Sequence, residues 1–499
     1  MFKELRKLVK HSGIYTFGNF TSKILGILLI PLYTKVIDVN VFGIYSILEV
    51  TLQFMVGILH LGLPLALLRW LNLEDNKERS GIILFSVFIS TLFIAIAVFI
   101  AMFGLKSTIS ELLFGSTKYT DCLLLISLIA GINLLNNIGL TYLRSEEKSV
   151  LFISVSIVRF FIQLIITIYL VAFLKVGIIG IFGGQLSGSI IGSLFLFPMM
   201  MKRFTIRINI REIKEMLSFG YPLAFEGISN RILNMGDRYI LGYLTNWSIV
   251  GIYSLGYKFA NLIDTMFIKS FRYAFLPLAW KKLNDDNAER YYAKMLTYFV
   301  FFIFWLTLFI SVFSKGIIHI FARDKSYWDA YIIVPIAVFA ISIKGMFSVV
   351  KMGLQFKSKT TYIALIVASA AVFNVVLNFI LIPFFGMMGA AVATLLSFVC
   401  IVIAGYYYSN KFYPIKFEWY RIAKIITVIC GMYGVSFIFN PLPIIPRIIV
   451  KFIFILLYPL ILYMFKFYYA SELSRIKGGW RKWSNIKNWK KNLKNIKLN

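Results

Sequence analysis

Apolar runs long enough to cross a lipid bilayer recur along the whole chain. Clear cases cover residues 82–103, 151–174, 299–313 and 363–383. A helix needs roughly 20 apolar residues to cross the hydrocarbon core of a membrane. A soluble protein can bury one such run in its core, but it cannot keep many of them from water, and 59% of the 499 residues are hydrophobic. We therefore predict an all-α integral membrane protein.

The hydropathy pattern predicts about fourteen membrane-spanning helices. Each one is an apolar stretch bounded by polar or charged residues. The predicted spans are 13–35, 42–66, 81–104, 120–142, 150–173, 179–201, 217–243, 248–276, 295–314, 328–353, 360–383, 387–409, 422–440 and 447–467.

Positive charge is concentrated in the breaks between these runs, and the formal net charge is +30. Strongly basic breaks alternate with less basic ones. The basic breaks contain Arg69, Lys77, Arg79, Arg144, Lys148, Lys202, Arg203, Arg207, Arg211, Lys214, Lys281, Lys282, Arg290, Lys294, Lys357, Lys359, Lys411, Lys416, Arg421 and Lys424. Because basic loops stay in the cytoplasm, this alternation predicts a multi-pass protein of the cytoplasmic membrane with both termini in the cytoplasm. It accounts for the charge without nucleic acid, so we expect no nucleic-acid partner.

A short motif recurs in the two halves of the chain. Residues 42–46 (FGIYS) match residues 250–254 (VGIYS) at an offset of 208, and residues 176–180 (VGIIG) match 385–389 (FGMMG) at an offset of 209. The offset covers about six helices, an even number, so both copies enter the membrane in the same direction. Chance similarity between glycine-rich apolar turns is the alternative explanation. We favour two parallel repeats of six helices each.

The repeat divides the chain into four segments. Residues 1–210 form an N-terminal six-helix lobe and residues 211–410 a C-terminal six-helix lobe. Residues 411–467 supply two additional transmembrane helices, and residues 468–499 form a basic cytoplasmic tail. The tail has apolar residues at helical spacing among Lys and Arg, which favours an interfacial helix on anionic lipids. A disordered basic tail is the alternative.

Polar residues follow one face of the first two helices of each predicted repeat. In the first repeat they are Thr16, Asn19, Lys23, Ser46, Glu49, Gln53, Gly57 and His60. In the second repeat they are Glu226, Asn230, Arg231, Asn234, Asp237, Arg238, Lys258, Asn261, Asp264, Thr265, Lys269 and Arg272. Charges inside a membrane are costly unless they face water or a partner. A polar lumen between the two halves explains their placement, and structural ion pairs within the bundle are the alternative.

The predicted lumen contains charges of both signs. The candidate substrate-binding residues are Asn19, Lys23, Glu49, Gln53, Asn230, Arg231, Lys258, Asn261, Lys269 and Arg272. The cations are suited to phosphate or uronate groups, which accept charge-assisted hydrogen bonds. The carboxylates either pair with these cations or bind a coupling proton or sodium ion, and the candidates for ion coupling are Glu49, Glu226, Asp237 and Asp264.

The sequence predicts no metal site and no cofactor. The cysteines and histidines lack the spacing of metal ligands, and we interpret the cysteines as small buried hydrophobic residues. These cysteines are Cys122, Cys400 and Cys430.

Several short motifs resemble those of one family. They are SGIY at 12–15, LYTK at 32–35, FGIYS at 42–46, LGLPLA at 61–66, RW at 69–70, GYPL at 220–223, DRYIL at 237–241 and VGIYS at 250–254. In this order and spacing the chain resembles polysaccharide exporters of the O-antigen flippase (Wzx-like) type. They belong to the MOP superfamily, which also contains lipid II flippases and MATE drug exporters.

The resemblance implies two six-helix lobes arranged in a V, with two further C-terminal helices. It implies that an undecaprenyl-diphosphate-linked oligosaccharide moves from the inner to the outer leaflet by alternating access, for surface polysaccharide biosynthesis. The basic cavity residues would be Lys23, Arg231, Lys258 and Arg272. A proton gradient, a sodium gradient or the membrane potential would drive transport, and other polysaccharide assembly proteins would be partners.

Two other functions compete with this one. A MATE-type drug or metabolite exporter has the same fold, but its substrates are usually cations, which the lysines and arginines would repel. A membrane glycosyltransferase or polymerase usually needs a sizeable catalytic loop, and the predicted outer loops are short. The sequence has no Walker motif, no HExxH and no phosphate-cradling glycine loop, so we expect a transporter and not an enzyme.

Overall fold

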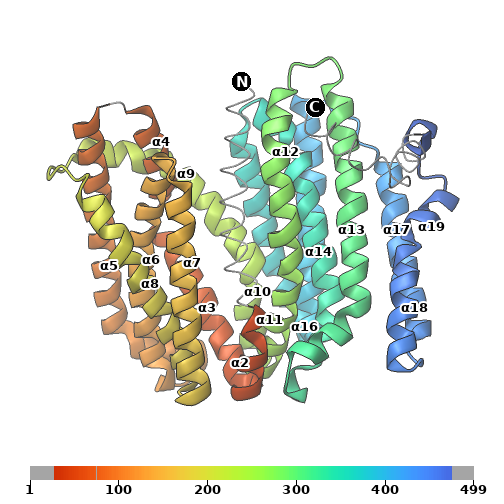
Figure 1. Ribbon diagram of the computed structural model, residues 1–499, viewed down its shortest axis with the longest axis horizontal. Helices are drawn as coiled ribbons and strands as arrows, with labels where there is room; N and C mark the ends of the chain where they lie inside the picture. The colour runs from red at the N-terminus through yellow and green to blue at the C-terminus, as the bar shows by residue number, and fades with distance from the viewer. Residues whose placement is uncertain (1–26, 75, 475–499) are drawn as a thin grey trace, which may run out of the picture.

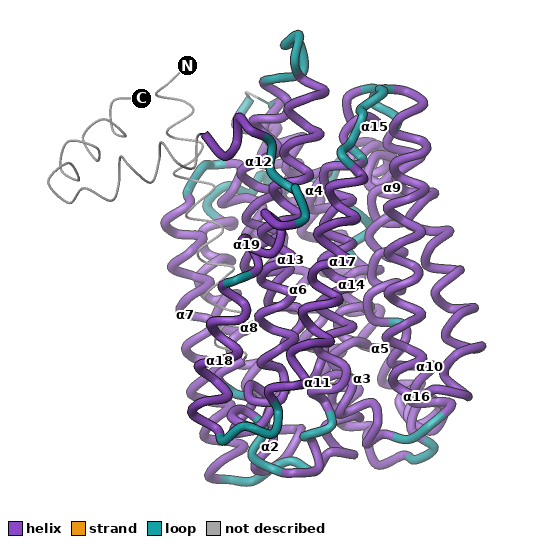
Figure 2. Tube along the Cα trace, turned by 90° about the vertical axis from the view of Figure 1, so that its right-hand side faces the viewer, coloured by secondary structure: helices purple, strands orange, loops and turns teal. Residues whose placement is uncertain are grey.

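The computed structural model describes residues 27–74 and 76–474 of the chain. Within these residues the chain forms long helices and no strand. The helices lie side by side in two bundles, with a smaller group of helices beside the second bundle (Figure 1). The view turned by 90° shows that most helices share one direction (Figure 2). The predicted all-α class is confirmed.

We call the two bundles the N-lobe and the C-lobe. The N-lobe contains α2 (Ile30–Val36), α3 (Val39–Leu59), α4 (Leu63–Leu73), α5 (Lys77–Phe114), η1 (Thr117–Tyr119), α6 (Thr120–Ser145), α7 (Ser149–Ile168), η2 (Tyr169–Phe173) and α8 (Gly177–Met201). The C-lobe contains α9 (Ile210–Met235), α10 (Asp237–Leu244), α11 (Trp247–Ile263), η3 (Asp264–Ile268), α12 (Lys269–Lys281), α13 (Ala288–Phe321), η4 (Lys325–Tyr327), α14 (Ala330–Val350), α15 (Met352–Phe356) and α16 (Thr360–Phe412). The accessory group contains α17 (Trp419–Val435), η5 (Ser436–Phe439), α18 (Ile444–Leu456) and α19 (Tyr458–Met464).

The predicted spans that lie within the described residues are mostly helical, but a turn at residues 60–62 interrupts the span 42–66, and a break at residue 457 interrupts the span 447–467. Nine helices in that part of the chain are long and apolar enough to cross a membrane, or ten if the bent pair α18–α19 is one span. The predicted spans 217–243 and 248–276 are interrupted and carry more charge, which keeps them outside that number. The first predicted span extends outside the described residues. The total of fourteen, like the division of the chain into four segments, therefore stays a prediction.

The longest helical element, α16, contains two predicted spans joined by a sharp turn. Gly386 has φ 54° and ψ −132°, a backbone conformation that favours glycine. A side-chain carbon added to Gly389 would lie 2.4 Å from the carbonyl oxygen of Leu381. This close approach shows that the chain folds back on itself here, so 360–383 and 387–409 form two passes.

Basic loops gather at one end of the molecule, which we call the basic end. The loops 202–209 and 282–287 are both at the top of Figure 1, and α2 and the turn at Gly386 belong to the other end, which we call the opposite end. This arrangement is expected if the basic end faces the cytoplasm. The cytoplasmic placement of the termini stays a prediction.

The repeated motif at 42–46 and 250–254 forms a contact between the lobes. A side-chain carbon added to Gly43 would lie 1.9 Å from the carbonyl oxygen of Trp247, and one added to Gly251 would lie 2.4 Å from that of Val39. The two contacts are equivalent under the offset of 208. Glycine at both positions lets α3 and α11 approach until their backbones touch, as in close-packed membrane helices. The repeat is therefore a structural device that joins the two lobes at the opposite end.

The large apolar core that combines both lobes lies toward the opposite end. One cluster of buried residues combines the opposite-end halves of α3, α5, α6 and α8 with the C-lobe. A second, separate cluster fills the basic-end half of the N-lobe and includes Leu67, Leu84, Leu143 and Met216. Met216 comes from α9, whose first turns pack on the N-lobe while its later turns pack on α16. The helix α9 thus connects the two lobes near the basic end.

The accessory helices are attached to α13 by a buried network at the basic end. The Arg421 guanidinium contacts Glu418 Oε2 at 2.8 Å and Glu472 Oε2 at 2.7 Å. Its charge also lies 4.3 Å from the ring centre of Phe467. Glu418 accepts a hydrogen bond from Thr297 on α13 at 2.7 Å. These contacts link α13, α17 and the segment after α19.

Large apolar side chains cover much of the outer surface, as expected for helices in contact with lipid. Ile445, Ile449 and Phe452 on α18 are examples of exposed residues. The cysteines only partly fit their predicted burial, because Cys122 is buried while Cys400 and Cys430 are exposed. That prediction was wrong for the last two because, in a membrane, apolar helix faces are stable without protein contact.

Candidate functional site

An ion pair joins the two lobes roughly two helical turns beyond the contact between Gly43 and Gly251, along α3 and α11. Lys258 Nζ of α11 lies 3.3 Å from Glu49 Oε2 of α3, and the two side chains are 27% and 29% exposed. The same ammonium lies 4.8 Å from the ring centre of Tyr45 and 5.1 Å from that of Phe42. Both charges were predicted to face the lumen, and the structure places them against each other across the lobe boundary.

A π-helical segment builds the next pair along the same pass. The segment η3 interrupts the pass between α11 and α12. Because π-helical hydrogen bonds run between residues five apart, Asp264 and Lys269 lie on one face, and Lys269 Nζ is 2.8 Å from Asp264 Oδ2. Both side chains remain about one-third exposed, at 33% and 27%. Arg272 follows one turn later and is exposed. Irregular turns of this kind are frequent at functional sites in helices.

Arg231 extends from α9 against α3 of the N-lobe. Its guanidinium packs over Gly57, where an added side-chain carbon would lie 2.5 Å from the guanidinium carbon. Its Nη1 donates a hydrogen bond to the carbonyl oxygen of Gly227 at 3.3 Å. His60 lies close enough to Arg231 for the two side chains to interact electrostatically. Arg231 therefore lies at the boundary between the lobes, nearer the basic end than Lys258.

Two lysines, Lys344 on α14 and Lys351 directly after that helix, belong to this region and were missed by the sequence analysis. Lys344 Nζ donates a hydrogen bond to Asn234 Oδ1 at 2.6 Å. It is also close enough to Asp264, Lys269 and Lys351 to interact with them electrostatically. Lysines inside the apolar span 328–353 were a usable signal, because a charge in such a run marks a functional position by default.

The charges on α3, α9, α11, η3, α12 and α14, together with Lys351 after α14, lie along this boundary, and we call them the interlobe cluster. Its cations are Arg231, Lys258, Lys269, Arg272, Lys344 and Lys351, and its carboxylates are Glu49, Glu226 and Asp264. Cations outnumber carboxylates two to one. The group therefore carries net positive charge at membrane depth, which suits an anionic ligand.

Asp237 lies inside the C-lobe and not on the surface between the lobes. It is 1% exposed and accepts hydrogen bonds from Tyr253 and, at 3.4 Å, from Thr394 Oγ1. Asn374 Nδ2 donates to Thr394 at 3.4 Å, and Asn378 Nδ2 donates to Asn374 Oδ1 at 2.9 Å. This chain of oxygen and amide groups, all buried, surrounds one carboxylate with side chains that also ligate hard cations.

The N-lobe has a polar centre of different chemistry. Arg159 Nη2 donates to Asn133 Oδ1 at 3.0 Å, and Ser189 Oγ donates to the same oxygen at 3.0 Å. Gly192 makes room for the arginine, because an added side-chain carbon would lie 2.4 Å from Arg159 Cδ. No carboxylate of the described residues lies within ion-pair distance of Arg159. The sequence analysis missed this residue, although an arginine in the apolar span 150–173 was a usable signal.

The remaining predicted residues are less closely grouped. Asn230 is exposed and accepts a hydrogen bond from Asn234, while Asn261 is exposed and Gln53 is partly buried. Glu226 is close enough to Lys351 to interact with it. The predicted Asn19 and Lys23 lie outside the described residues.

Comparison of the sequence with known families gives one extended match. Residues 34–331, more than half of the chain, match the profile of a family described as polysaccharide biosynthesis proteins. A curated relative, the probable low-salt glycan biosynthesis flippase Agl15 of Haloferax volcanii, is 26% identical over 237 residues. The match covers 47% of this chain and 50% of the relative, so it spans about half of that protein's length.

Comparison of the structure gives similar folds over most of the chain. The lipid II flippase MurJ in an inward closed conformation has a TM-score of 0.75 at 18% identity and covers 90% of this chain and 98% of that one. An inward-facing MATE multidrug transporter of the MOP superfamily has a TM-score of 0.63 at 13% identity, covering 82% and 95%. A mutant of the Vibrio cholerae MATE transporter VcmN has a TM-score of 0.59 at 14% identity, covering 81% and 96%. At these identities the likeness concerns the fold alone.

Proposed function

The chain belongs to the polysaccharide biosynthesis protein family and has the fold of the MOP superfamily, and from this premise we propose that it is a flippase for a lipid-linked oligosaccharide. The substrate would be an undecaprenyl-diphosphate-linked sugar unit that moves from the inner to the outer leaflet. Alternating access of a site between the lobes would carry it across. The family match and the flippase activity of the named relatives support a transporter.

The single observation that carries the substrate proposal is the excess of cations in the interlobe cluster. A diphosphate brings two or more negative charges into the membrane, and charge-assisted hydrogen bonds from Lys and Arg are a strong way to hold it. The ion pairs Glu49–Lys258 and Asp264–Lys269 remain partly exposed. Partly exposed charges at membrane depth require contact with water, which supports a water-accessible passage at this boundary.

The proposed motion follows from how the lobes are joined. The opposite end shares one apolar core, while the basic-end half of the N-lobe has its own core. Opening at the basic end therefore separates fewer apolar contacts than opening at the opposite end. Near the basic end, α9 touches α4 where an added side-chain carbon on Gly62 would lie 2.2 Å from the carbonyl oxygen of Gly220. We assign this contact to the closure of the inner-leaflet side.

Ion coupling is assigned to Asp237. Glu49 and Asp264 are engaged by lysines, whereas the Arg238 donor lies 3.4 Å from Asp237, a long contact. A buried carboxylate beside Thr394, Asn374 and Asn378 can take up a proton or bind a sodium ion through oxygen ligands. We expect Asp237→Asn to abolish gradient-driven transport while leaving substrate binding intact. Equal transport rates with and without a sodium or proton gradient, in the wild type, would contradict the coupling.

The test of the function is transport of a fluorescent undecaprenyl-diphosphate oligosaccharide in proteoliposomes. We expect Arg231→Ala, Arg272→Ala and Lys344→Ala each to slow transport about tenfold or more, because each removes one charge-assisted contact. The variants should still insert and elute as the wild type does. Lys202→Gln, an exposed charge at the basic end, is the matched control. Wild-type rates in all three variants would refute the assignment of the interlobe cluster.

A second candidate is a MATE-type exporter, because MATE transporters share the fold. Its usual substrates are cations, which the interlobe cluster repels. Transport of organic cations such as ethidium, with no transport of the lipid-linked sugar, would favour this candidate. A glycosyltransferase would instead transfer the sugar of a nucleotide-sugar donor to an acceptor and release the nucleotide, and nucleotide release by the purified protein is the assay.

A further inference from the structure

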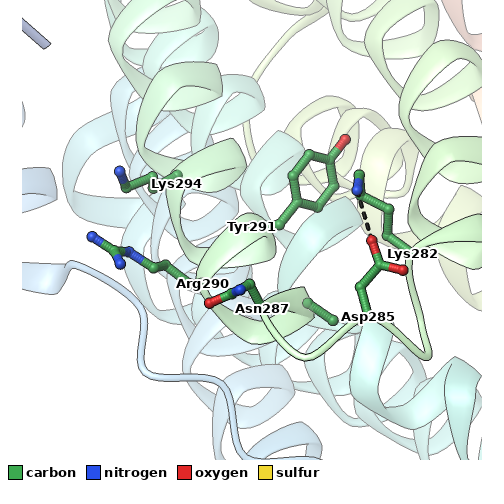
Figure 3. Close-up of a pocket in the computed structure, with 7 residues that line it drawn as sticks. Lys282, Asp285, Asn287, Arg290, Tyr291 and Lys294 are labelled. Carbon is green, nitrogen blue, oxygen red and sulfur yellow. Dashed lines mark hydrogen bonds and ion pairs between the residues drawn. The ribbon is translucent and has the colours of Figure 1, made fainter. Parts of the chain in front are cut away.

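A hollow lies at the basic end of the C-lobe, where α12 ends and α13 begins. Its volume is about 380 Å³. Figure 3 shows Arg290 and Lys294 on one side of the first turns of α13, with Tyr291 and the bonded pair Lys282–Asp285 on the other. The lining residues are Lys282, Asp285, Asn287, Ala288, Arg290, Tyr291 and Lys294. Small-molecule sites in proteins occupy roughly 300–1,000 Å³, so the hollow has the size of a ligand site.

The charges around the hollow are unbalanced. Lys282 Nζ lies 2.7 Å from Asp285 Oδ2, and this hydrogen bond and ion pair raise the pKa of Lys282. The single carboxylate of the lining is thereby engaged. Within the described residues, neither Arg290 nor Lys294 has a carboxylate at ion-pair distance. Arg290 and Lys294 are therefore available to bind an anion. Glu289, on the same turn of α13, is not part of the lining.

The start of α13 adds to the positive field. Asn287 precedes the helix, and its side chain makes no capping hydrogen bond. The first N–H groups of a helix carry partial positive charge and favour an anion nearby. Because α13 runs from Ala288 to Phe321, this is the end of a long helix. The field of the helix and the cations therefore act on the same hollow.

Orientation in the membrane does not by itself account for this arrangement. Basic residues at the cytoplasmic end orient the protein wherever they stand in the loops. Lys77 and Lys202 serve that purpose as exposed side chains on the N-lobe. At the start of α13, by contrast, three cations surround one hollow with a tyrosine and an asparagine that can donate hydrogen bonds.

We propose that this hollow binds a phosphate group presented at the basic end. The group belongs either to the headgroup of an anionic phospholipid in that leaflet or to a soluble phosphate compound. Arg290 and Lys294 would supply the charge, and Asn287 and Tyr291 would orient the oxygens. The site lies outside the interlobe cluster, so its occupancy is separate from the proposed transport.

The test uses the full chain in nanodiscs of a neutral phospholipid. Inorganic pyrophosphate is titrated by calorimetry, and in a second arm phosphatidylglycerol bound to the purified protein is counted by native mass spectrometry. The test variant is Arg290→Gln with Lys294→Gln. The control variant is Lys77→Gln with Lys202→Gln, which removes the same charge from the same end of the molecule.

We expect the test variant to lose about tenfold or more in affinity for one of the two ligands, and the control to keep it. Loss of pyrophosphate binding identifies a soluble ligand, and loss of phosphatidylglycerol identifies a lipid headgroup. If the wild type binds neither ligand, or if the test and control variants lose binding equally, the proposal is overturned. Transport is not part of the readout, so failure here leaves the proposed function untouched.

Discussion

The two ends of the boundary between the lobes are held together by different interactions. At the opposite end, Gly43 and Gly251 bring α3 and α11 into backbone contact within one continuous apolar core. Near the basic end, the N-lobe has a separate core and meets α9 at Gly62 and Gly220. The ion pair Arg79–Glu212, at 3.0 Å, also joins α5 to α9 on this side.

This difference indicates which end of the boundary between the lobes separates more easily. Apolar burial stabilises roughly in proportion to area and is insensitive to salt, whereas partly exposed ion pairs contribute little and are screened. In the alternating access that we propose, the opposite end is therefore the firm joint and the basic end is the part that opens. The following predictions test this contrast, from the largest expected effect to the smallest.

Replacing Gly251 should have the largest effect. In Gly251→Leu the new side chain would start 2.4 Å from the carbonyl oxygen of Val39, so α3 and α11 must separate. The destabilisation should exceed the roughly 1–3 kcal/mol typical of overpacked cores. Thermal unfolding followed by size-exclusion elution measures it. Gly431→Leu is the control, since Gly431 has open space around it. Equal stability of the two variants would contradict the conclusion that the opposite end is the firmer joint.

Replacing Gly220 should change access more than stability. In Gly220→Val the added carbon would lie 2.7 Å from the carbonyl oxygen of Leu61, so α9 must move away from α4. The core shared at the opposite end stays intact, and only the contacts of α9 with the second core, such as those of Met216, are disturbed. We therefore expect the melting temperature to fall much less than in Gly251→Leu. A cysteine introduced at Gln53 should react faster with an impermeant maleimide added from the basic end, once the native cysteines are replaced. Unchanged labelling with a large loss of stability would contradict this prediction.

Acid should weaken the attachment of the accessory helices at the basic end. Burial alone would raise the pKa of Glu472, but hydrogen bonds from the Tyr469 N–H, Arg421 and Tyr298 hold it below the ordinary value of 4.5. A carboxyl whose pKa is lowered on folding stabilises the fold above its unfolded pKa, and this contribution is lost as the pH falls through the folded pKa.

The acid effect can be followed by proteolysis of the segment after α19. It should be resistant at pH 7 and become sensitive only below the ordinary carboxyl pKa of 4.5, as the pH falls through the lowered pKa of Glu472. Glu472→Gln should already be sensitive at pH 7, because a neutral amide cannot pair with Arg421. Resistance of Glu472→Gln at pH 7 would show that the ion pair does not anchor the segment.

Removing the exposed ion pair of α9 should have the smallest effect. Arg211 and Glu215 on this helix are 90% and 53% exposed, so solvent and salt screen their pairing at 3.4 Å. We expect Arg211→Ala to leave the melting temperature unchanged within error at physiological salt. A large loss would show that exposed ion pairs at the basic end contribute more than this screening allows.

Much of the fold was predictable because it depends on local composition. The apolar runs identified the membrane helices, and the repeat of 42–46 at 250–254 identified a parallel internal symmetry. The family resemblance drawn from the motifs was confirmed by the match over residues 34–331. Within the site, the face containing Glu49, Lys258 and Lys269 was predicted from helical spacing, and the structure pairs two of these residues directly.

The side chains that each charged residue contacts were not predictable from spacing alone. The sequence grouped Asp237 with the charges of the lumen, but the structure places it inside the C-lobe with Thr394, which is far away in the chain. It also brings Lys344 to Asn234 and leaves Arg159 beside the neutral Asn133. These choices depend on which faces of distant helices meet.

The sequence by itself therefore determined that this protein is a multi-pass membrane protein of apolar helices, and its repeated motif predicted that the two halves are related. The apolar helices follow from the transfer of each segment between water and lipid, which depends on local composition. Only the tertiary structure decided which charges neutralise one another, which cations remain in excess and which end has a shared core. Those properties depend on contacts between helices that are distant in the chain, where distances of a few ångströms set the electrostatic energy.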